Sequence, residues 1–339
     1  MFFNETKVVN ARLLFEKDTG GIIEIFCLEP SDNIDPQIAL QQKNCVTWNC
    51  MVGGAKKWKD SPITMTLEGI EIKATKLGRN NDEFIVCFEW PGDLSFSDIL
   101  EKSGELPLPP YMNRKAEKED LKRYQTVYAQ HEGSVAAPTA GLHFTEELTD
   151  SFASKGVSSV FITLHVGAGT FKPVKTDSIS DHNMHAELID VSIDAIFGII
   201  EAFGPIIPVG TTSLRTLESL YWFGVLASVG KLNGDVPELA QWSHTSLPEL
   251  NLRQSIRALL DYLDAHGKTR FIAKTSLMIT PGYKFKVARG LITNFHMPKS
   301  TLLFIISAMI GDNWKTLYKH ALKNDFRFLS YGDCCLLLP

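Results

Sequence analysis

The strongest constraint on the fold is a proline-rich stretch about a third of the way along the chain. The segment Leu106-Pro107-Leu108-Pro109-Pro110-Tyr111 has three prolines within four positions. Because proline fixes its own φ and keeps the preceding residue out of the helical region, this stretch is extended and interrupts regular structure. The hydrophobic pattern also differs on its two sides. The stretch therefore marks a boundary between two modules of different fold class.

The residues before this boundary have the two-residue periodicity of β-strands. Within residues 46–52, apolar side chains alternate with polar or small ones, as in a strand with one buried face. A hairpin is expected around Glu68-Gly69, where two alternating runs meet at a turn. No convincing helix is present, so a small antiparallel barrel or curled sheet is predicted. Strands are expected at 8–15, 21–28, 46–52, 63–67, 70–74 and 82–90.

The residues after the boundary alternate between helix and strand patterns, which favours an α/β main domain. Thr145 is expected to begin the first helix and Gly156 to end it, and Gly267 is expected to end a later one. Helices are expected at 145–155, 194–202, 210–229, 252–266, 302–310 and 314–322, and strands at 158–164, 188–191, 206–209 and 326–329.

Composition narrows the class of protein further. A chain of 339 residues favours two domains. Its formal charge of −5 excludes a protein that is basic over its whole surface and coats nucleic acid. It does not exclude a local basic face. The longest apolar run, 302–310, is too short to cross a bilayer, and the N-terminus does not have the pattern of a secretory signal. None of the six cysteines forms a CxxC pair, so reduced thiols and a cytoplasmic location are expected.

A run of small residues suggests a ligand site. Residues 133–141 read GSVAAPTAG, which leaves little side-chain volume to fill a core but lets a ligand approach the main chain. His143 follows this run, His165 ends a later strand, and a second small-residue turn follows at 167–170. Small-residue loops flanked by histidines predict a site for a polar organic molecule.

Two further clusters have open interpretations. Gly210-Thr211-Thr212-Ser213 opens a helix and either binds a carboxylate or phosphate or is simply a cap. Arg215 and Glu218 in the same helix either face a ligand or pair with each other. The segment His182–Glu187, with His165, either ligates a metal or performs acid–base chemistry, and we favour the second because the spacing matches no common zinc motif.

The last polar clusters flank the C-terminal helices. Residues 294–301 read NFHMPKST, in which Ser300 or Thr301 caps a helix and His296 and Lys299 either face an anionic partner or are structural. The turn Tyr331-Gly332-Asp333 either is only a turn or places a carboxylate opposite a cationic ligand.

Several long strings resemble the S-adenosylmethionine:tRNA ribosyltransferase-isomerase family of queuosine biosynthesis. They are NETKVVNARL, LPLPPYMNR, GSVAAPTAGLHFT, TLHVGAGTFKPV, MHAE, VGTTSLRTLESL, LITNFHMPKSTLL and FRFLSYGD. The resemblance spans essentially the whole chain. It implies transfer and isomerisation of the ribosyl part of S-adenosylmethionine onto 7-aminomethyl-7-deazaguanine at the tRNA wobble position. The products would be epoxyqueuosine in tRNA, adenine and methionine, with S-adenosylmethionine as a substrate and no metal.

The resemblance also implies roles for particular residues. A base must remove a proton beside the sulfonium, and an acid must protonate the leaving adenine. The expected proton-transfer residues are His143, His165, His185 and Glu187. The expected substrate-binding residues are Ala137, Pro138, Thr139, Gly141, Gly167, Gly169, Thr170, Thr211, Thr212, Arg215, Asn294, His296, Tyr331 and Asp333. The expected tRNA contacts are Arg114, Lys122, Arg123 and Lys299.

The family architecture implied is an α/β main domain with an inserted small antiparallel β-barrel. The expected boundaries are 1–7 for a residual N-terminal part of the main domain, 8–98 for the barrel and 99–339 for the catalytic domain. Members usually carry a further segment before NETKV, so the chain is expected to begin inside a main-domain strand. A monomer with no membrane association is expected. The alternatives are an impaired paralogue that binds tRNA or S-adenosylmethionine, and a metal-dependent hydrolase using His165, His182, His185 and Glu187.

Overall fold

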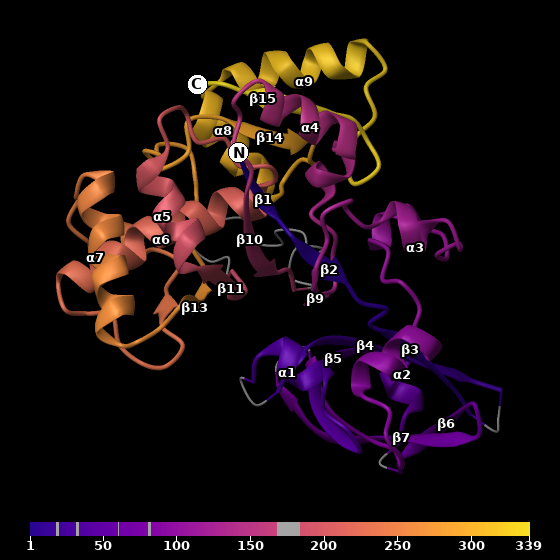
Figure 1. Cartoon of the computed structure of the whole chain (residues 1–339). Helices are drawn as coiled ribbons and strands as arrows, with labels where there is room; N and C mark the ends of the chain where they lie inside the picture. The colour runs from indigo at the N-terminus through magenta and orange to yellow at the C-terminus, as the bar shows by residue number, and fades with distance from the viewer. Residues whose placement is uncertain (18–19, 32–33, 60, 81–82, 168–183) are drawn as a thin grey trace. The chain divides into compact units, whose positions relative to one another are not determined.

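The protein forms two compact units in a computed structural model (Figure 1). The α/β unit comprises residues 1–5, 126–129 and 138–339, and the barrel unit comprises residues 6–125 and 130–137. The structure describes residues 1–17, 20–31, 34–59, 61–80, 83–167 and 184–339.

The barrel unit is built on a six-stranded antiparallel sheet in the order β3-β4-β5-β8-β7-β6. The outer strands β3 and β6 also contact each other, so the sheet curls into a nearly closed barrel. The antiparallel sheet expected from the alternating pattern is confirmed. The strands are β3 (Arg12–Glu16), β4 (Ile22–Pro30), β5 (Cys45–Gly53), β6 (Ile63–Leu67), β7 (Ile70–Asn80) and β8 (Glu83–Glu89).

The expected hairpin is also confirmed, because β6 and β7 pair from Leu67↔Ile70 onward. Its two turn residues, Glu68 and Gly69, have φ values of 51° and 85°. Positive φ at both positions is the geometry whose twist matches that of the two strands.

Helices within the barrel unit contradict the expectation that it has none. α2 (Phe96–Ser103) begins with a capping box, in which Ser95 and Asp98 each accept from the other's backbone N–H. Phe96, fully buried, packs its ring 5.2 Å from Phe88 and 5.5 Å from Trp48. This helix was missed because it is only eight residues long and has few apolar residues. The shorter helical segments are α1 (Pro36–Leu40), α3 (Asp120–Arg123), and the single turns η1 (Ala55–Lys57) and η2 (Pro110–Met112).

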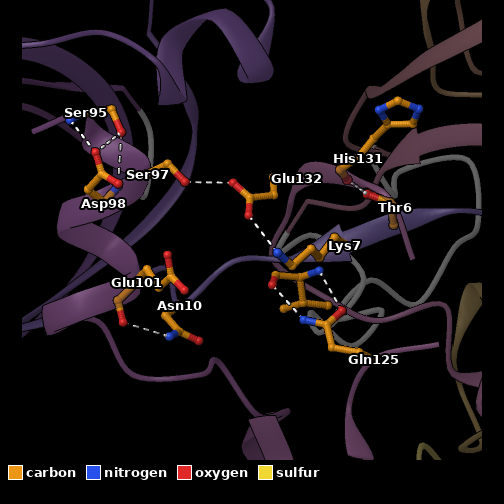
Figure 2. Close-up of polar contacts among 11 residues, drawn as sticks. Thr6, Lys7, Asn10, Ser95, Ser97, Asp98, Glu101, Gln125, His131 and Glu132 are labelled. Carbon is orange, nitrogen blue, oxygen red and sulfur yellow. Dashed lines mark hydrogen bonds and ion pairs between the residues drawn. The ribbon is translucent and has the colours of Figure 1, made fainter. Parts of the chain in front are cut away.

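A two-stranded parallel ribbon is braced against α2 in the same unit (Figure 2). It consists of β2 (Thr6–Val8) and β9 (His131–Ser134). The Glu132 carboxylate accepts from Lys7 Nζ at 2.9 Å and from Ser97 Oγ at 2.7 Å. Gln125 binds both the N–H and the C=O of Val8. Side chains from two segments outside the ribbon, Ser97 of α2 and Gln125, thereby hold it in place.

The α/β unit has a five-stranded mixed sheet in the order β1-β10-β11-β13-β12. β1 is parallel to β10, β11 is antiparallel to both of its neighbours, and β12 is parallel to β13. A mixed α/β fold is therefore confirmed. The strands are β1 (Phe2–Asn4), β10 (Val160–His165), β11 (Glu187–Ser192), β12 (Glu238–Leu239) and β13 (Arg270–Thr275).

The helices of this unit follow their predicted ranges closely, and four of them begin at a side-chain cap. Thr145, Ser192, Asn251 and Ser300 each accept from a backbone N–H at a helix start. α5 contacts β10 and β11, α6 contacts β1 and β10, and α7 packs against α5 and α6 (Figure 1). The helices are α4 (Glu146–Ser154), α5 (Ile193–Glu201), α6 (Thr211–Ser228), α7 (Leu252–Ala265), α8 (Thr301–Ile310) and α9 (Asn313–Lys323), with single turns η3 (Thr139–His143) and η6 (Ser243–Thr245).

Two segments of the α/β unit that were expected to be strands, 206–209 and 326–329, do not form regular strands. Residues 326–329 do not form a strand, since Leu329 has φ 71° and Asp333 N–H donates back to the Arg327 carbonyl, which makes this segment a loop. The closing strand is instead β15 (Cys334–Leu337), antiparallel to β14 (Leu291–Asn294). Residues 206–209 make only single bridges, Phe2↔Pro208 and Val209↔Ile292.

Candidate active site

A hydrogen-bonded chain of three expected site residues lies in the α/β unit. Thr139 and His143 stand at the two ends of η3, and Asn294 is the last residue of β14. Thr139 Oγ1 donates to Asn294 Oδ1 at 2.8 Å, and Asn294 Nδ2 lies 3.4 Å from His143 Nε2. Asn294 is 2% exposed, whereas His143 is only half-buried. The buried amide thus fixes an imidazole that solvent and a ligand can reach.

The start of α6 lies next to these residues. The Gly210 N–H donates to the Ile292 carbonyl at 2.8 Å, which anchors the helix start to β14. Gly210 has φ 90°, and a Cβ there would lie 3.9 Å from Ala140 of η3. Thr211 and Thr212, expected to bind substrate, therefore follow a glycine that contacts the His143 segment. Free N–H groups at such a start suit a carboxylate or phosphate.

Asp333 lies in the same region, because the next residue, Cys334, pairs with Asn294. Its carboxylate accepts from the backbone N–H of Arg327 at 2.7 Å and from the guanidinium at 3.2 Å. These bonds hold the pKa of Asp333 below its ordinary value, and the charge of His143 adds to the effect. Arg327 was not expected from the sequence, although it lies in the FRFLSYGD string. Tyr331, two residues before Asp333, is half-buried.

Glu187 and Arg215 form a buried ion pair. Arg215 Nη1 lies 3.0 Å from Glu187 Oε2, and both side chains are 7% exposed. The pair joins the first residue of β11 to the second turn of α6. It explains why an arginine is tolerated on a helix face that is otherwise buried.

Arg215 and Glu218 do not pair with each other, which excludes one of the two interpretations of this helix. Glu218 is fully buried and accepts from Tyr283 Oη and from the backbone N–H groups of Lys286, Val287 and Ala288, at 2.8–3.0 Å. Burial raises the pKa of this carboxyl, and the four donors oppose that change. Glu218 therefore fastens the 283–288 loop to α6.

His165 and His185 lie at the ends of neighbouring segments. His165 is the last residue of β10, is buried, and pairs in register with Leu188 of β11, next to Glu187. His185 precedes β11 and is exposed. The antiparallel pairing of β10 with β11 thus brings the sequence-distant His165 and Glu187 to adjacent register positions.

His296 is half-buried and hydrogen-bonded to neighbouring residues. Its Nε2 lies 2.8 Å from Thr293 Oγ1, and its backbone N–H donates to Tyr318 Oη at 2.9 Å. Burial lowers the pKa of His296 to about 4. At neutral pH the ring is therefore uncharged, and a contact of His296 with substrate stays a prediction.

The small-residue run is packed tightly, as its lack of side-chain volume suggests. A Cβ at Gly141 would overlap the hydroxyl of Tyr128, so only glycine fits there. Pro138 is buried, and Ala137, which belongs to the barrel unit, is 8% exposed. Gly167 is half-buried. Gly169, Thr170 and His182 lie outside the described residues.

The four expected tRNA contacts differ in their surroundings. In the barrel unit, Arg114 makes a bidentate ion pair with Asp120 at 2.5 and 2.9 Å, Arg123 lies 4.0 Å from Glu119, and Lys122 is exposed. In the α/β unit, Lys299 is exposed with φ 57°.

Within the described ranges, no group of three histidine, cysteine, aspartate or glutamate side chains is arranged to hold a metal ion. No helix in those ranges has both the length and the apolar character needed to cross a membrane.

A half-buried histidine held by a buried amide, a nearby carboxylate and a helix start thus lie in one mixed α/β unit, an arrangement suited to an enzyme that binds a polar molecule and moves protons. The sequence model of the queuosine biosynthesis protein family matches residues 1–337, and the chain belongs to that family. The resemblance found in the sequence is therefore confirmed.

Relatives with a shared name support this assignment. An S-adenosylmethionine:tRNA ribosyltransferase-isomerase from Dechloromonas aromatica is 39% identical over 342 residues, covering 99% of this chain and 82% of the relative. One from Clostridium kluyveri is 39% identical over 340 residues, covering 98% and 83%. Among solved structures, an S-adenosylmethionine tRNA ribosyltransferase from Thermotoga maritima is 24% identical, covers 99% of this chain and 81% of its own, and has a TM-score of 0.39.

Proposed function

We propose that this protein is an S-adenosylmethionine:tRNA ribosyltransferase-isomerase. It transfers the ribosyl part of S-adenosylmethionine to 7-aminomethyl-7-deazaguanine at the wobble position of tRNA and isomerises it. Epoxyqueuosine in tRNA, adenine and methionine are the products. The family membership and the names of two relatives at 39% identity support the reaction. The main structural support for this active site is the contact of Asn294 with both Thr139 and His143.

The reaction needs groups that accept and donate protons near the sulfonium nucleoside. The carbon beside the sulfonium is acidified and must lose a proton, and adenine leaves more readily when protonated. We assign one of these transfers to His143, because it is half-buried and its ring contacts a buried partner, Asn294. We assign the remaining transfers to His165, His185 and Glu187, with no order of steps.

The donor substrate has a cationic sulfonium and an anionic carboxylate, and the site offers a partner for each. Asp333, whose carboxyl group has a lowered pKa, is the proposed partner of the sulfonium. The start of α6 at Thr211 and Thr212 is the proposed partner of the methionine carboxylate. The other expected substrate-binding residues keep that role in the proposal, except His296, which acts through its uncharged ring.

Three features of organisation complete the proposal. The barrel unit is an insertion into the α/β unit, the enzyme works as a monomer in the cytoplasm, and Lys122, Arg123 and Lys299 contact tRNA. The bidentate ion pair of Arg114 with Asp120 instead gives that arginine a role in stabilising α3.

The experiment is to incubate the purified protein with S-adenosylmethionine and a tRNA that carries the aminomethyl-deazaguanine base. Adenine and methionine should form only when both substrates are present. Retention of S-adenosylmethionine without adenine release would indicate a binding protein that has lost turnover, and would contradict the proposal.

A further inference from the structure

The exposed side of α9 carries a row of lysines. Lys315, Lys319 and Lys323 recur at four-residue intervals and are all exposed, while Tyr318 and Ala321 are the buried residues of this helix. Residues four apart lie on the same side of an α-helix. The row therefore runs along the solvent face of α9.

This region is basic in an acidic protein. Residues 312–327 contain three lysines and one arginine against two aspartates, which gives 4 − 2 = +2 in a chain with a net charge of −5. Lys315 is partly neutralised by Asp312 at 2.7 Å. Lys319 and Lys323 form no ion pair with any residue that the structure describes. Their charges are thus available to an anionic partner.

The basic row belongs to the same part of the α/β unit as the candidate active site. Tyr318 of α9 binds the backbone of His296, two residues after Asn294. The segment after α9 packs Phe326 against Phe295, with ring centroids 5.8 Å apart. It then supplies Arg327, which holds Asp333. In Figure 1, α9 lies beside α8 in this C-terminal part of the unit. The helix that carries the lysine row therefore packs on the segments that supply Asn294 and Asp333.

We propose that Lys319 and Lys323 on the exposed face of α9 bind the phosphate backbone of the substrate tRNA. The inference rests on the proposed function, which supplies tRNA as the polyanion. Lysine ammonium groups bind RNA phosphates as point charges and add a salt-dependent term to affinity. Unlike Arg114, which is held by Asp120, these two lysines need not break an ion pair with a described residue to bind.

The test is a salt titration of tRNA binding with the double variant Lys319→Gln/Lys323→Gln. The matched control is Lys155→Gln/Lys231→Gln, because Lys155 and Lys231 are exposed in the same unit and have no ion pair with a described residue. Over roughly 50 to 200 mM salt, the slope of log K against log salt should shrink by about two in the α9 variant. At the low end of this range its affinity should fall about tenfold or more. The control should bind like the unchanged protein.

Calorimetry with S-adenosylmethionine alone should give the same affinity for all three proteins, which would establish that the variants are folded. An unchanged salt slope in the α9 variant would overturn the inference and leave the proposed function standing. Weaker binding of the α9 variant to anionic phospholipid vesicles, with unchanged tRNA binding, would also overturn it. Failure of the unchanged protein to bind tRNA would contradict both proposals.

Discussion

Asn294 holds the imidazole of His143, with its Nδ2 3.4 Å from the ring Nε2 and its Oδ1 fixed by Thr139. Removal of the amide in Asn294→Ala leaves Thr139 and His143 without this common partner. We expect the kcat for adenine release to fall about a hundredfold, because a misplaced acid–base group loses much of its contribution. The KM for S-adenosylmethionine should change less. Thr149→Val, in α4, is the control, and equal losses in both variants would contradict a specific role for Asn294.

His143→Ala should abolish measurable adenine release, since general acid–base groups contribute roughly 10²- to 10⁴-fold. The residue is half-buried, so its removal should leave the free energy of unfolding nearly unchanged. Activity within a few-fold of the unchanged protein would show that His143 is not a proton-transfer residue.

The buried pair of Glu187 and Arg215 predicts a stability effect. Arg215→Met leaves the Glu187 carboxylate buried without its cation, which should lower the free energy of unfolding by about 3 to 5 kcal/mol. The double variant Arg215→Met/Glu187→Leu removes both charges and should recover most of this loss in urea unfolding. If the double variant is stable but inactive, the pair serves the reaction as well as the fold. A single variant as stable as the unchanged protein would contradict the ion pair.

His296 predicts a pH dependence of stability. Its folded pKa of about 4 lies below the ordinary value of 6.5. As the pH falls from 6.5 toward 4, the unfolded chain takes up a proton on this ring and the folded protein does not, so stability is lost in that window. The loss is at most about 3 kcal/mol. His296→Gln should remove this part of the pH dependence in urea unfolding at several pH values, whereas His320→Gln, at an exposed position, should keep it.

Close packing around Gly332, next to Asp333, leaves no room for a side chain at this position. A Cβ at this position would overlap the backbone of Arg327 and Phe328, whereas a Cβ at the exposed Gly204 would meet nothing. Gly332→Ala should lower the free energy of unfolding by roughly 1 to 3 kcal/mol, and Gly204→Ala should be nearly neutral. Equal melting temperatures for the two variants would contradict the close packing of this turn.

Features set by local sequence were predictable. The hairpin at Glu68-Gly69 and the helix caps at Thr145 and Ser300 are encoded within a few residues, and the structure has them as expected. β14 and β15 were not predicted, because four-residue strands that pair over more than forty positions have no distinctive pattern of their own. Residues 326–329 have strand propensity, but the bonds of Arg327 to Asp333 make them a loop.

The composition of the candidate site was predictable, but its pairings were not. Thr139, His143, Asn294 and Asp333 were all expected from their strings, yet nothing local shows that Asn294 lies between Thr139 and His143. The partner of Arg215 is twenty-eight positions away in β11, not one turn along its own helix. Such contacts depend on strand register and helix docking, which a single sequence does not reveal.

The most direct measurement follows the ribosyl carbons of isotopically labelled S-adenosylmethionine into tRNA that bears the aminomethyl-deazaguanine base. After digestion, mass spectrometry should find the label in epoxyqueuosine, with one adenine released for each nucleoside formed, and no label in tRNA treated with His143→Ala. Unlabelled tRNA after incubation with the unchanged protein, under conditions in which both substrates are bound, would contradict ribosyl transfer at this site.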